Sequence, residues 1–146
     1  MSMTSDVPGR TNGAGSQTIL VVEDNAELRH FFGWTLRNAG YRVEIAEDAI
    51  GAVSTARQVR PDLVVLDLGL PGGSGAAVLE RLRNLSATAL VDVIVITGAI
   101  PDYDRSRELE ALGCDTVLLK PVTHEQLLSA ISEKTNSAHG QGQQSA

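Results

Sequence analysis

The clearest feature of the hydrophobic pattern is the run Leu63-Val64-Val65-Leu66-Asp67, four large apolar residues followed by one carboxylate. Pro61-Asp62 precede the run, and a segment rich in glycine and proline, 69–73, follows it. A short continuous apolar run between turn-forming residues is typical of a strand buried on both faces, as in a parallel sheet. By the same argument, further strands are predicted at 18–22, 91–97 and 116–119. A weaker alternation of apolar and polar residues predicts one more at 41–46.

Between these runs, and after the last one, apolar residues recur at the spacing of an α-helix. Helices are predicted over 28–39, over 49–59, from Ser74 or Gly75 to 85, and over 104–112, and a last one begins near Thr123. Asp48 is a suitable N-cap for the second helix. Thr123 and Gln126 have the spacing of a capping box for the last. The 104–112 segment is mostly polar, so we expect it to be the most loosely packed helix.

Strict alternation of strands and helices predicts an α/β fold, a doubly wound five-stranded parallel sheet with helices on both faces. The expected strand order is 2-1-3-4-5, with the topological switch point between strands 1 and 3. One folded domain is predicted over 18–134. The flanking segments, 1–17 and 135–146, are rich in small polar residues and are expected to be disordered tails.

Composition narrows the class of protein. The chain has 146 residues, and its net charge of −6 disfavours a nucleic-acid-binding surface but suits a site that holds a cation. Cys114 is the only cysteine, so no internal disulfide can form. We find neither a signal sequence nor an apolar run of about 18 residues, and therefore expect a cytoplasmic protein without membrane contact.

Polar side chains follow four neighbouring strands of the predicted sheet. Glu23 and Asp24 follow the first strand. Asp67 and Thr97 are the last residues of the third and fourth strands, and Lys120 follows the fifth. In the expected order these four strands are adjacent, and their carboxyl ends meet at one edge, where open α/β sheets bind ligands. Three carboxylates, a hydroxyl and an ammonium group are therefore expected to converge there.

Each of these residues also has an ordinary structural interpretation. Asp67 can open a turn, and Asp24 with Glu27 can form a capping box. Thr97 can be a β-branched strand residue, and Lys120 can be a surface lysine. The functional interpretation depends on their occurring together at the ends of strands whose interiors are almost entirely apolar.

The expected cluster of Glu23, Asp24 and Asp67 favours a bound cation. Two carboxylates about 4 Å apart repel by about 4 kcal/mol at an effective dielectric constant of about 20. Carboxylate oxygens are hard ligands of the kind that magnesium (Mg²⁺) prefers. An aspartate can also attack phosphorus and form an aspartyl-phosphate. Lys120 and Thr97 would then neutralise and position the phosphoryl group.

These segments resemble the receiver domain of two-component response regulators, which has a flavodoxin/CheY-like (βα)5 fold. The resemblance covers about 18–134 and rests on four motifs: Val21-Val22-Glu23-Asp24-Asn25, Leu66-Asp67 with Pro71 and Gly75 downstream, Ile96-Thr97-Gly98, and Leu119-Lys120-Pro121.

The resemblance implies a role for each of these residues. Asp67 is the phosphoacceptor, and Thr97 and Lys120 contact the phosphoryl oxygens. Glu23, Asp24, Asp67 and the backbone carbonyl of Gly69 are implied Mg²⁺ ligands, and the Lys120–Pro121 peptide bond is implied to be cis. The implied partners are a sensor histidine kinase or a histidine phosphotransfer protein as phosphodonor, and a downstream protein target.

Three features depart from the family pattern. Val117 occupies a strand-5 position that is usually aromatic, so we expect switching to involve 98–112 rather than a rotating ring. Gly69 and Ala99 lack the polar side chains that many receivers have beside the site, which affects the lifetime of the phosphate. The segment between Thr97 and Lys120 is slightly longer than in common members.

Several alternatives remain at this stage. A flavin mononucleotide protein would place phosphate near Glu23 and Asp24, which would repel it. An aspartate-dependent phosphatase needs a second carboxylate where Gly69 stands. A receiver-like interaction domain that is never phosphorylated would not need the complete residue set. The chain can also be a stand-alone receiver or a receiver cut from a larger regulator or hybrid kinase.

Overall fold

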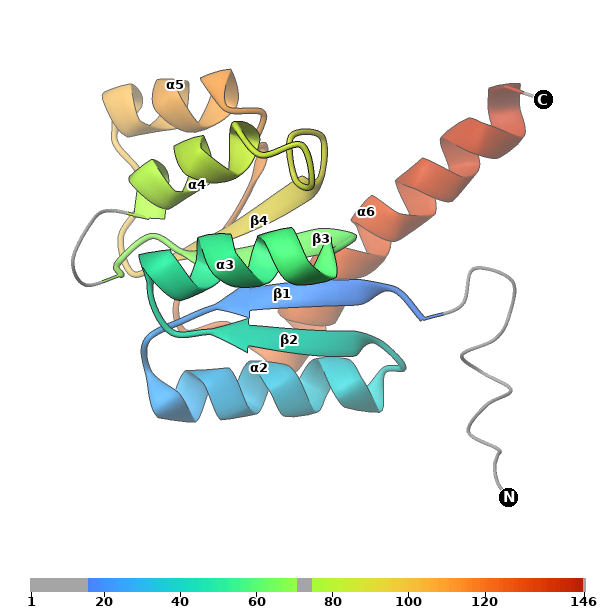
Figure 1. Cartoon of the computed structure of the whole chain (residues 1–146), viewed down its shortest axis with the longest axis horizontal. Helices are drawn as coiled ribbons and strands as arrows, with labels where there is room; N and C mark the ends of the chain where they lie inside the picture. The colour runs from blue at the N-terminus through green and yellow to red at the C-terminus, as the bar shows by residue number, and fades with distance from the viewer. Residues whose placement is uncertain (1–15, 71–74, 146) are drawn as a thin grey trace.

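The computed structural model describes residues 16–70 and 75–145, with side chains described as far as residue 136. It contains one parallel sheet in the order β2-β1-β3-β4-β5 (Figure 1). The strands are β1 (Thr18–Val22), β2 (Arg42–Ala46), β3 (Leu63–Asp67), β4 (Asp92–Thr97) and β5 (Thr116–Leu119). The helices are α2 (Ala26–Asn38), α3 (Ala49–Val59), α4 (Gly75–Arg83), α5 (Tyr103–Ala111) and α6 (His124–Ser145). The predicted fold class and strand order are confirmed.

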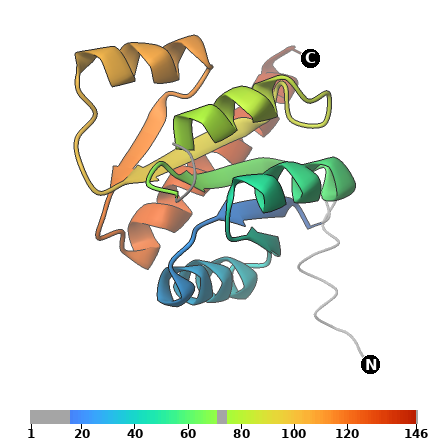
Figure 2. The ribbon, with the colours of Figure 1, turned by 60° about the vertical axis from the view of Figure 1, so that its left-hand side comes forward.

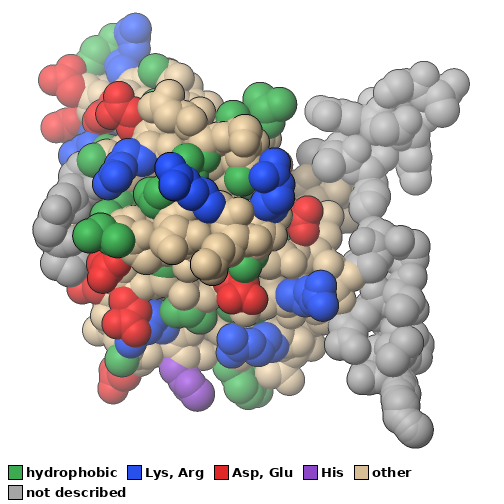
Figure 3. Space-filling view, viewed as in Figure 1, with side chains coloured by type: hydrophobic (Ala, Val, Ile, Leu, Met, Phe, Trp, Pro, Cys, Tyr) green, Lys and Arg blue, Asp and Glu red, His purple; other side chains and the backbone are tan. Residues whose placement is uncertain are grey.

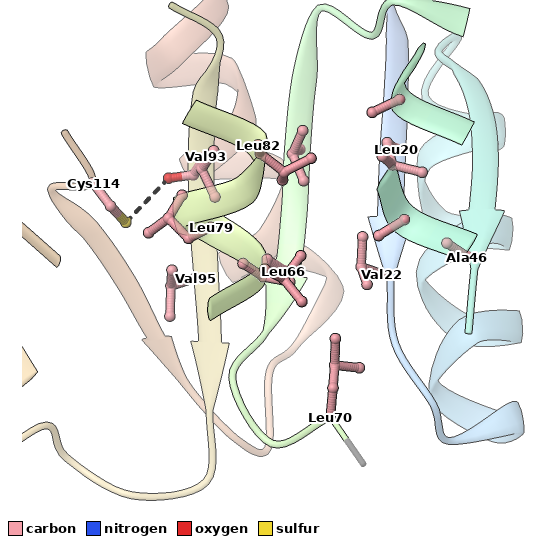
Figure 4. Packing of buried hydrophobic residues seen from close by; sticks show 14 of the residues in the cluster. Leu20, Val22, Ala46, Leu66, Leu70, Leu79, Leu82, Val93, Val95 and Cys114 are labelled. Atoms are coloured by element: carbon pink, nitrogen blue, oxygen red, sulfur yellow. Dashed lines mark hydrogen bonds between the residues drawn. The ribbon is translucent and has the colours of Figure 1, made fainter. Parts of the chain in front are cut away.

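Helices cover both faces of the sheet (Figure 2). Residues of α3, α4 and α5 join one hydrophobic cluster, whereas residues of α2 and α6 join the other. Successive residues of the central strands point to opposite clusters, since Val64 and Leu66 belong to the cluster with α4 while Leu63 and Val65 belong to the other. Figure 4 shows Leu66 beside Leu79 and Leu82 of α4. A strand that is buried on both faces cannot alternate polar and apolar residues, which explains the unbroken apolar run in β3.

The ends of the helices follow the predicted capping chemistry. Asp48 accepts a hydrogen bond from the Gly51 N–H at the start of α3. At the start of α6, the Gln126 N–H donates to the Thr123 hydroxyl and the Thr123 N–H donates to the Gln126 side chain. The N-cap of α2 is Asn25, which accepts from the Leu28 N–H. Asp24 therefore does not cap α2, and its carboxylate remains available at the edge of the sheet.

The C-terminal segment differs from the sequence-based expectation. Composition predicts disorder over 135–146, but α6 continues to Ser145. Each residue added to an existing helix gains one hydrogen bond, so alanine, glutamine and serine can extend a helix that packing has already nucleated. The expected N-terminal tail lies almost wholly outside the described residues. Within the described chain, none of the helices has the length and apolar character that crossing a bilayer requires.

Candidate phosphoryl and metal site

The carboxyl ends of β1, β3, β4 and β5 surround a cleft of about 550 Å³. Its lining includes every side chain that the strand-end argument predicts: Glu23, Asp24, Asp67, Thr97 and Lys120. Its rim is completed by the loop after Thr97 and by the start of α5, including Ile100, Pro101 and Arg105. The structure therefore brings the predicted residues together in one cleft.

The three acidic side chains form a compact group. One carboxylate oxygen from each of Glu23, Asp24 and Asp67 lies within 4.8 Å of those of the other two. Glu23 and Asp67 are buried, whereas Asp24 is exposed at the mouth. Carboxylates this close repel one another. A divalent cation that binds all three through their oxygens would offset that repulsion. The group is a suitable place for a hard cation with one side open to solvent.

Lys120 supplies positive charge to the two buried carboxylates. Its Nζ lies 3.2 Å from Asp67 Oδ2 and 3.5 Å from Glu23 Oε1. The backbone N–H of Lys120 donates to the Thr97 carbonyl at 2.8 Å, and the Lys120–Pro121 peptide bond is cis, as the resemblance implies. The lysine is therefore fixed at its backbone and directed toward Asp67.

Among the side chains of the cleft, Glu23 has the pKa that departs furthest from its usual value. Burial, with a smaller contribution from the charge of Asp67, raises the pKa of Glu23 to about 7. The Asn25 N–H, which donates to Glu23 Oε2 at 3.1 Å, and Lys120 oppose this rise without cancelling it. Within the described residues, Glu23 Oε1 accepts no hydrogen bond. A buried carboxylate oxygen that has only the Lys120 ammonium at 3.5 Å and accepts no hydrogen bond fits a position that a cation would occupy.

The raised pKa of Glu23 makes stability depend on pH when a chelator is present. A glutamate in the unfolded chain has a pKa of 4.5, so between about pH 4.5 and 7 the folded state retains a proton that the unfolded state has lost. We therefore expect the contribution of this group to the unfolding free energy to fall as pH rises through about 7. Urea denaturation from pH 5 to 8 checks this. Glu23→Gln should remove that part of the slope, and Glu27→Gln at an exposed position should retain it.

Gly69 and Thr97 occupy different positions relative to Asp67. The Gly69 N–H donates to Asp67 Oδ1 at 2.9 Å, which holds the carboxylate in the cleft. The Thr97 hydroxyl is engaged with its own loop, where it donates to the Ala99 carbonyl and accepts from the Ala99 N–H at 3.2 and 3.3 Å. Val117 is 36% exposed on β5. Thr97 thus lines the cleft without a hydrogen bond to Asp67.

Arg29 of α2 is a site residue that the sequence argument missed. Its Nη1 donates to the backbone carbonyls of Glu23 and Asp24 at 3.2 and 2.8 Å, and its Nη2 lies 3.7 Å from Glu47 Oε2. One guanidinium therefore fastens the acidic loop after β1 to the loop after β2. An arginine in the first turns of an amphipathic helix looks like a solvent-exposed residue in the sequence pattern, so no signal marks it.

For the Mg²⁺ site that the sequence predicts, we expect Arg29→Lys to weaken metal binding about tenfold, a typical effect of removing a group that orients metal ligands. Lysine preserves the positive charge but not the planar fork that reaches the loop carbonyls through Nη1 and Glu47 through Nη2, so the variant isolates positioning from charge. Calorimetric titration with Mg²⁺ measures the effect, and Arg37→Lys on the same helix is the matched control. Equal affinity in wild type and Arg29→Lys would show that the acidic loop keeps its shape without this contact.

The response regulator receiver domain family matches residues 19–132. Among curated relatives, the phosphate regulon transcriptional regulatory protein PhoB of Escherichia coli is 36% identical over 116 residues, which are 80% of this chain and 50% of that protein. The DNA-binding response regulator MtrA of Mycobacterium tuberculosis is 35% identical over 115 residues, 79% of this chain and 49% of that protein. The chain spans about half the length of these relatives.

Solved structures show the same likeness. A CheY-like receiver domain protein of Methanospirillum hungatei superposes with a TM-score of 0.80 at 27% identity, covering 87% of this chain and 99% of that one. The receiver domain of a sensor histidine kinase of Pseudomonas aeruginosa superposes with a TM-score of 0.72 at 31% identity, covering 82% and 97%. That kinase receiver has a magnesium ion coordinated in its active site cleft.

Proposed function

Because the chain belongs to the response regulator receiver domain family, we propose that it accepts a phosphoryl group on Asp67 in an Mg²⁺-dependent reaction and thereby controls the binding of a protein partner. The observation that carries this proposal is the joint placement of Glu23, Asp24, Asp67 and Lys120 in one cleft. An acidic group beside a single directed lysine is the arrangement that phosphoryl transfer to a carboxylate requires.

In the proposed reaction, a carboxylate oxygen of Asp67 attacks the phosphorus of a phosphohistidine on a sensor kinase or phosphotransfer protein. The new oxygen–phosphorus bond forms as the nitrogen–phosphorus bond breaks, and the imidazole retains the electron pair. Lys120 lies against Asp67 and neutralises charge that arrives with the phosphoryl group. The Gly69 N–H orients the attacking carboxylate through Oδ1.

The ligands proposed for Mg²⁺ are Glu23, Asp24, Asp67 and the backbone carbonyl of Gly69. A bound Mg²⁺ supplies positive charge to the developing phosphoryl oxygens. Glu23 and Asp24 are held for this role by the backbone contacts of Arg29. Because burial raises the pKa of Glu23 to about 7, metal binding below that pH competes with protonation of this carboxyl.

The proposed partners are a cytoplasmic phosphodonor and a downstream protein target. The two curated relatives named above are regulators about twice the length of this match, and their names describe transcriptional regulation or DNA binding. For this chain, a stand-alone receiver and a receiver within a longer regulator or hybrid kinase are both compatible with the proposal. An unphosphorylated interaction domain is disfavoured, because it would have no use for two buried carboxylates, Glu23 and Asp67, held against the Lys120 ammonium.

A small-molecule phosphodonor such as acetyl phosphate tests the proposal without a cognate kinase. With Mg²⁺, we expect intact-mass spectrometry to show one added phosphoryl group, which is lost in mild base as an acyl phosphate is. Excess EDTA should abolish the modification, because the acidic cluster then keeps its full repulsion. Phosphorylation at an undiminished rate in EDTA would contradict the metal assignment, and absence of phosphorylation from both acetyl phosphate and a panel of sensor kinases would contradict the function.

The same sample tests the expected switch. Thr97 now bonds within its own loop, so contact with a phosphoryl group requires that loop to change. Beryllofluoride mimics the phosphoryl group, and amide shifts should be large over 98–112 and abolished by Thr97→Ala. Shifts limited to the neighbours of Asp67 would contradict this route.

A further inference from the structure

A second concave surface lies between α3 and α4, away from the acidic cleft. It has a volume of about 380 Å³ and is lined by Ile50, Val53, Ser54, Arg57, Gln58 and Arg81. None of these residues lines the acidic cleft. We call this surface the α3–α4 groove. Five of its six residues come from α3 at the spacing of one helix face, whereas Ala52 and Ala56 on the neighbouring face enter the core.

The groove combines apolar and basic side chains. Ile50 is 78% exposed and Val53 is partly buried, and together they form its apolar end. About 10 Å further along α3, Arg57 lies on the same face and Arg81 approaches from α4. Basic side chains spread across this face of the molecule in Figure 3.

Both arginines are without a counter-charge inside the described part of the chain. Neither the Arg57 nor the Arg81 guanidinium makes a hydrogen bond or an ion pair with another described residue, and the groove lining contains no carboxylate. The chain as a whole has a net charge of −6. Two unpaired guanidiniums beside an exposed isoleucine attract a ligand that carries carboxylates next to apolar groups.

We propose that the α3–α4 groove binds an acidic amphipathic helix of a partner protein. A groove between two packed helices accepts the side chains of a third helix, and binding of this kind uses anchors spaced at i, i+3 or i+4, and i+7. The partner helix must supply one or two aliphatic side chains that contact Ile50 and Val53. About two turns further along, the same partner helix must carry carboxylates that pair with Arg57 and Arg81.

Other occupants fit less well. Residues 1–15 contain one carboxylate, Asp6, with Arg10 close to it in the sequence, and 135–146 contain no Asp or Glu, so neither tail supplies the acidic partner. A second copy related by a two-fold axis would bring four arginines together, because a symmetric interface places the same patch on both sides. Two arginines on an acidic protein do not make the extended basic surface that a nucleic acid requires.

A designed peptide tests the proposal. The probe is a helical peptide of about four turns with leucines at i and i+3 and glutamates two turns further along, and the control peptide has lysine in place of each glutamate. We expect saturable amide shifts over 50–58 and around Arg81 with the glutamate peptide alone. Arg57→Gln and Arg81→Gln should each weaken binding by about fivefold, and Arg37→Gln on α2 should have no effect.

Three outcomes overturn the proposal. They are the absence of saturable shifts at millimolar peptide, equal binding of the lysine peptide, and binding that is insensitive to Arg57 and Arg81. Sedimentation measurements cover the remaining occupant, because self-association that the glutamate peptide displaces would assign the groove to a second copy and would also overturn the proposal. The result is separable from the proposed phosphorylation: Asp67→Asn should bind the peptide normally, and the Arg57→Gln/Arg81→Gln double variant should be phosphorylated normally.

Discussion

Asp67→Asn is expected to abolish phosphorylation from both acetyl phosphate and a sensor kinase while the protein stays folded. The substitution preserves the shape of the side chain but removes the anionic nucleophile. It also removes one of three clustered carboxylates, so repulsion with Glu23 falls while the Lys120 ammonium loses a partner. These effects oppose each other, and we expect the unfolding free energy to change by no more than about 1 kcal/mol.

Intact-mass spectrometry and urea denaturation measure the two parts of this expectation. Asp92→Asn is the matched control, since Asp92 is exposed at the opposite end of β4 from Thr97. That variant should take up phosphate like the wild type. If Asp67→Asn still gains a phosphoryl group, peptide mapping would identify the true acceptor, and the assignment of Asp67 would be wrong.

Much of the fold could be predicted because burial on both faces of a parallel sheet leaves a distinctive sequence pattern. The central strands read as unbroken apolar runs since successive side chains enter two different clusters. The weakest predicted strand, 41–46, corresponds to the edge strand β2, whose first four residues alternate between exposed and partly buried and whose last residue, Ala46, is buried. The C-terminal end of α6 could not be predicted, because a polar segment without apolar periodicity does not indicate where a helix ends.

The cleft could be predicted to the extent that its residues follow strands directly. Glu23, Asp67 and Lys120 are adjacent to strand ends, so strand order alone places them together. The orientation of Thr97 toward its own loop could not be predicted, since a side chain at a strand end can turn either way.

Two arginines show what the sequence pattern omits. Arg29 reaches the backbone of the acidic loop, and Arg83 donates to the carbonyls of Val91 and Leu112 at 2.6 and 2.7 Å. The hydrogen-bond acceptors of both arginines are backbone oxygens, which every residue carries, so nothing in the sequence marks these contacts. Such contacts can be identified only from the three-dimensional arrangement of the loops.

Gly75→Ala is expected to lower the stability of the protein and also to slow phosphorylation in the cleft. Gly75 is the first residue of α4, and its N–H donates to the Leu68 carbonyl at 2.9 Å. A Cβ at this position would lie 2.4 Å from the Leu68 Cα and 2.7 Å from the Asp67 carbonyl oxygen. Both atoms belong to the backbone and cannot rotate away, so α4 must separate from the end of β3.

We expect a loss of about 3 kcal/mol in unfolding free energy, which is typical of overpacking at a buried site. Phosphorylation of Asp67 should also slow, because the collision displaces the backbone that carries it. Gly98→Ala is the matched control: Gly98 also lies beside the cleft, but a Cβ there has no atom within 4 Å among the described residues. That variant should stay within about 1 kcal/mol of the wild type. Equal stability of the two variants in urea denaturation would mean that α4 can move away from Asp67 at little cost, and the close contact would then not hold the acceptor in place.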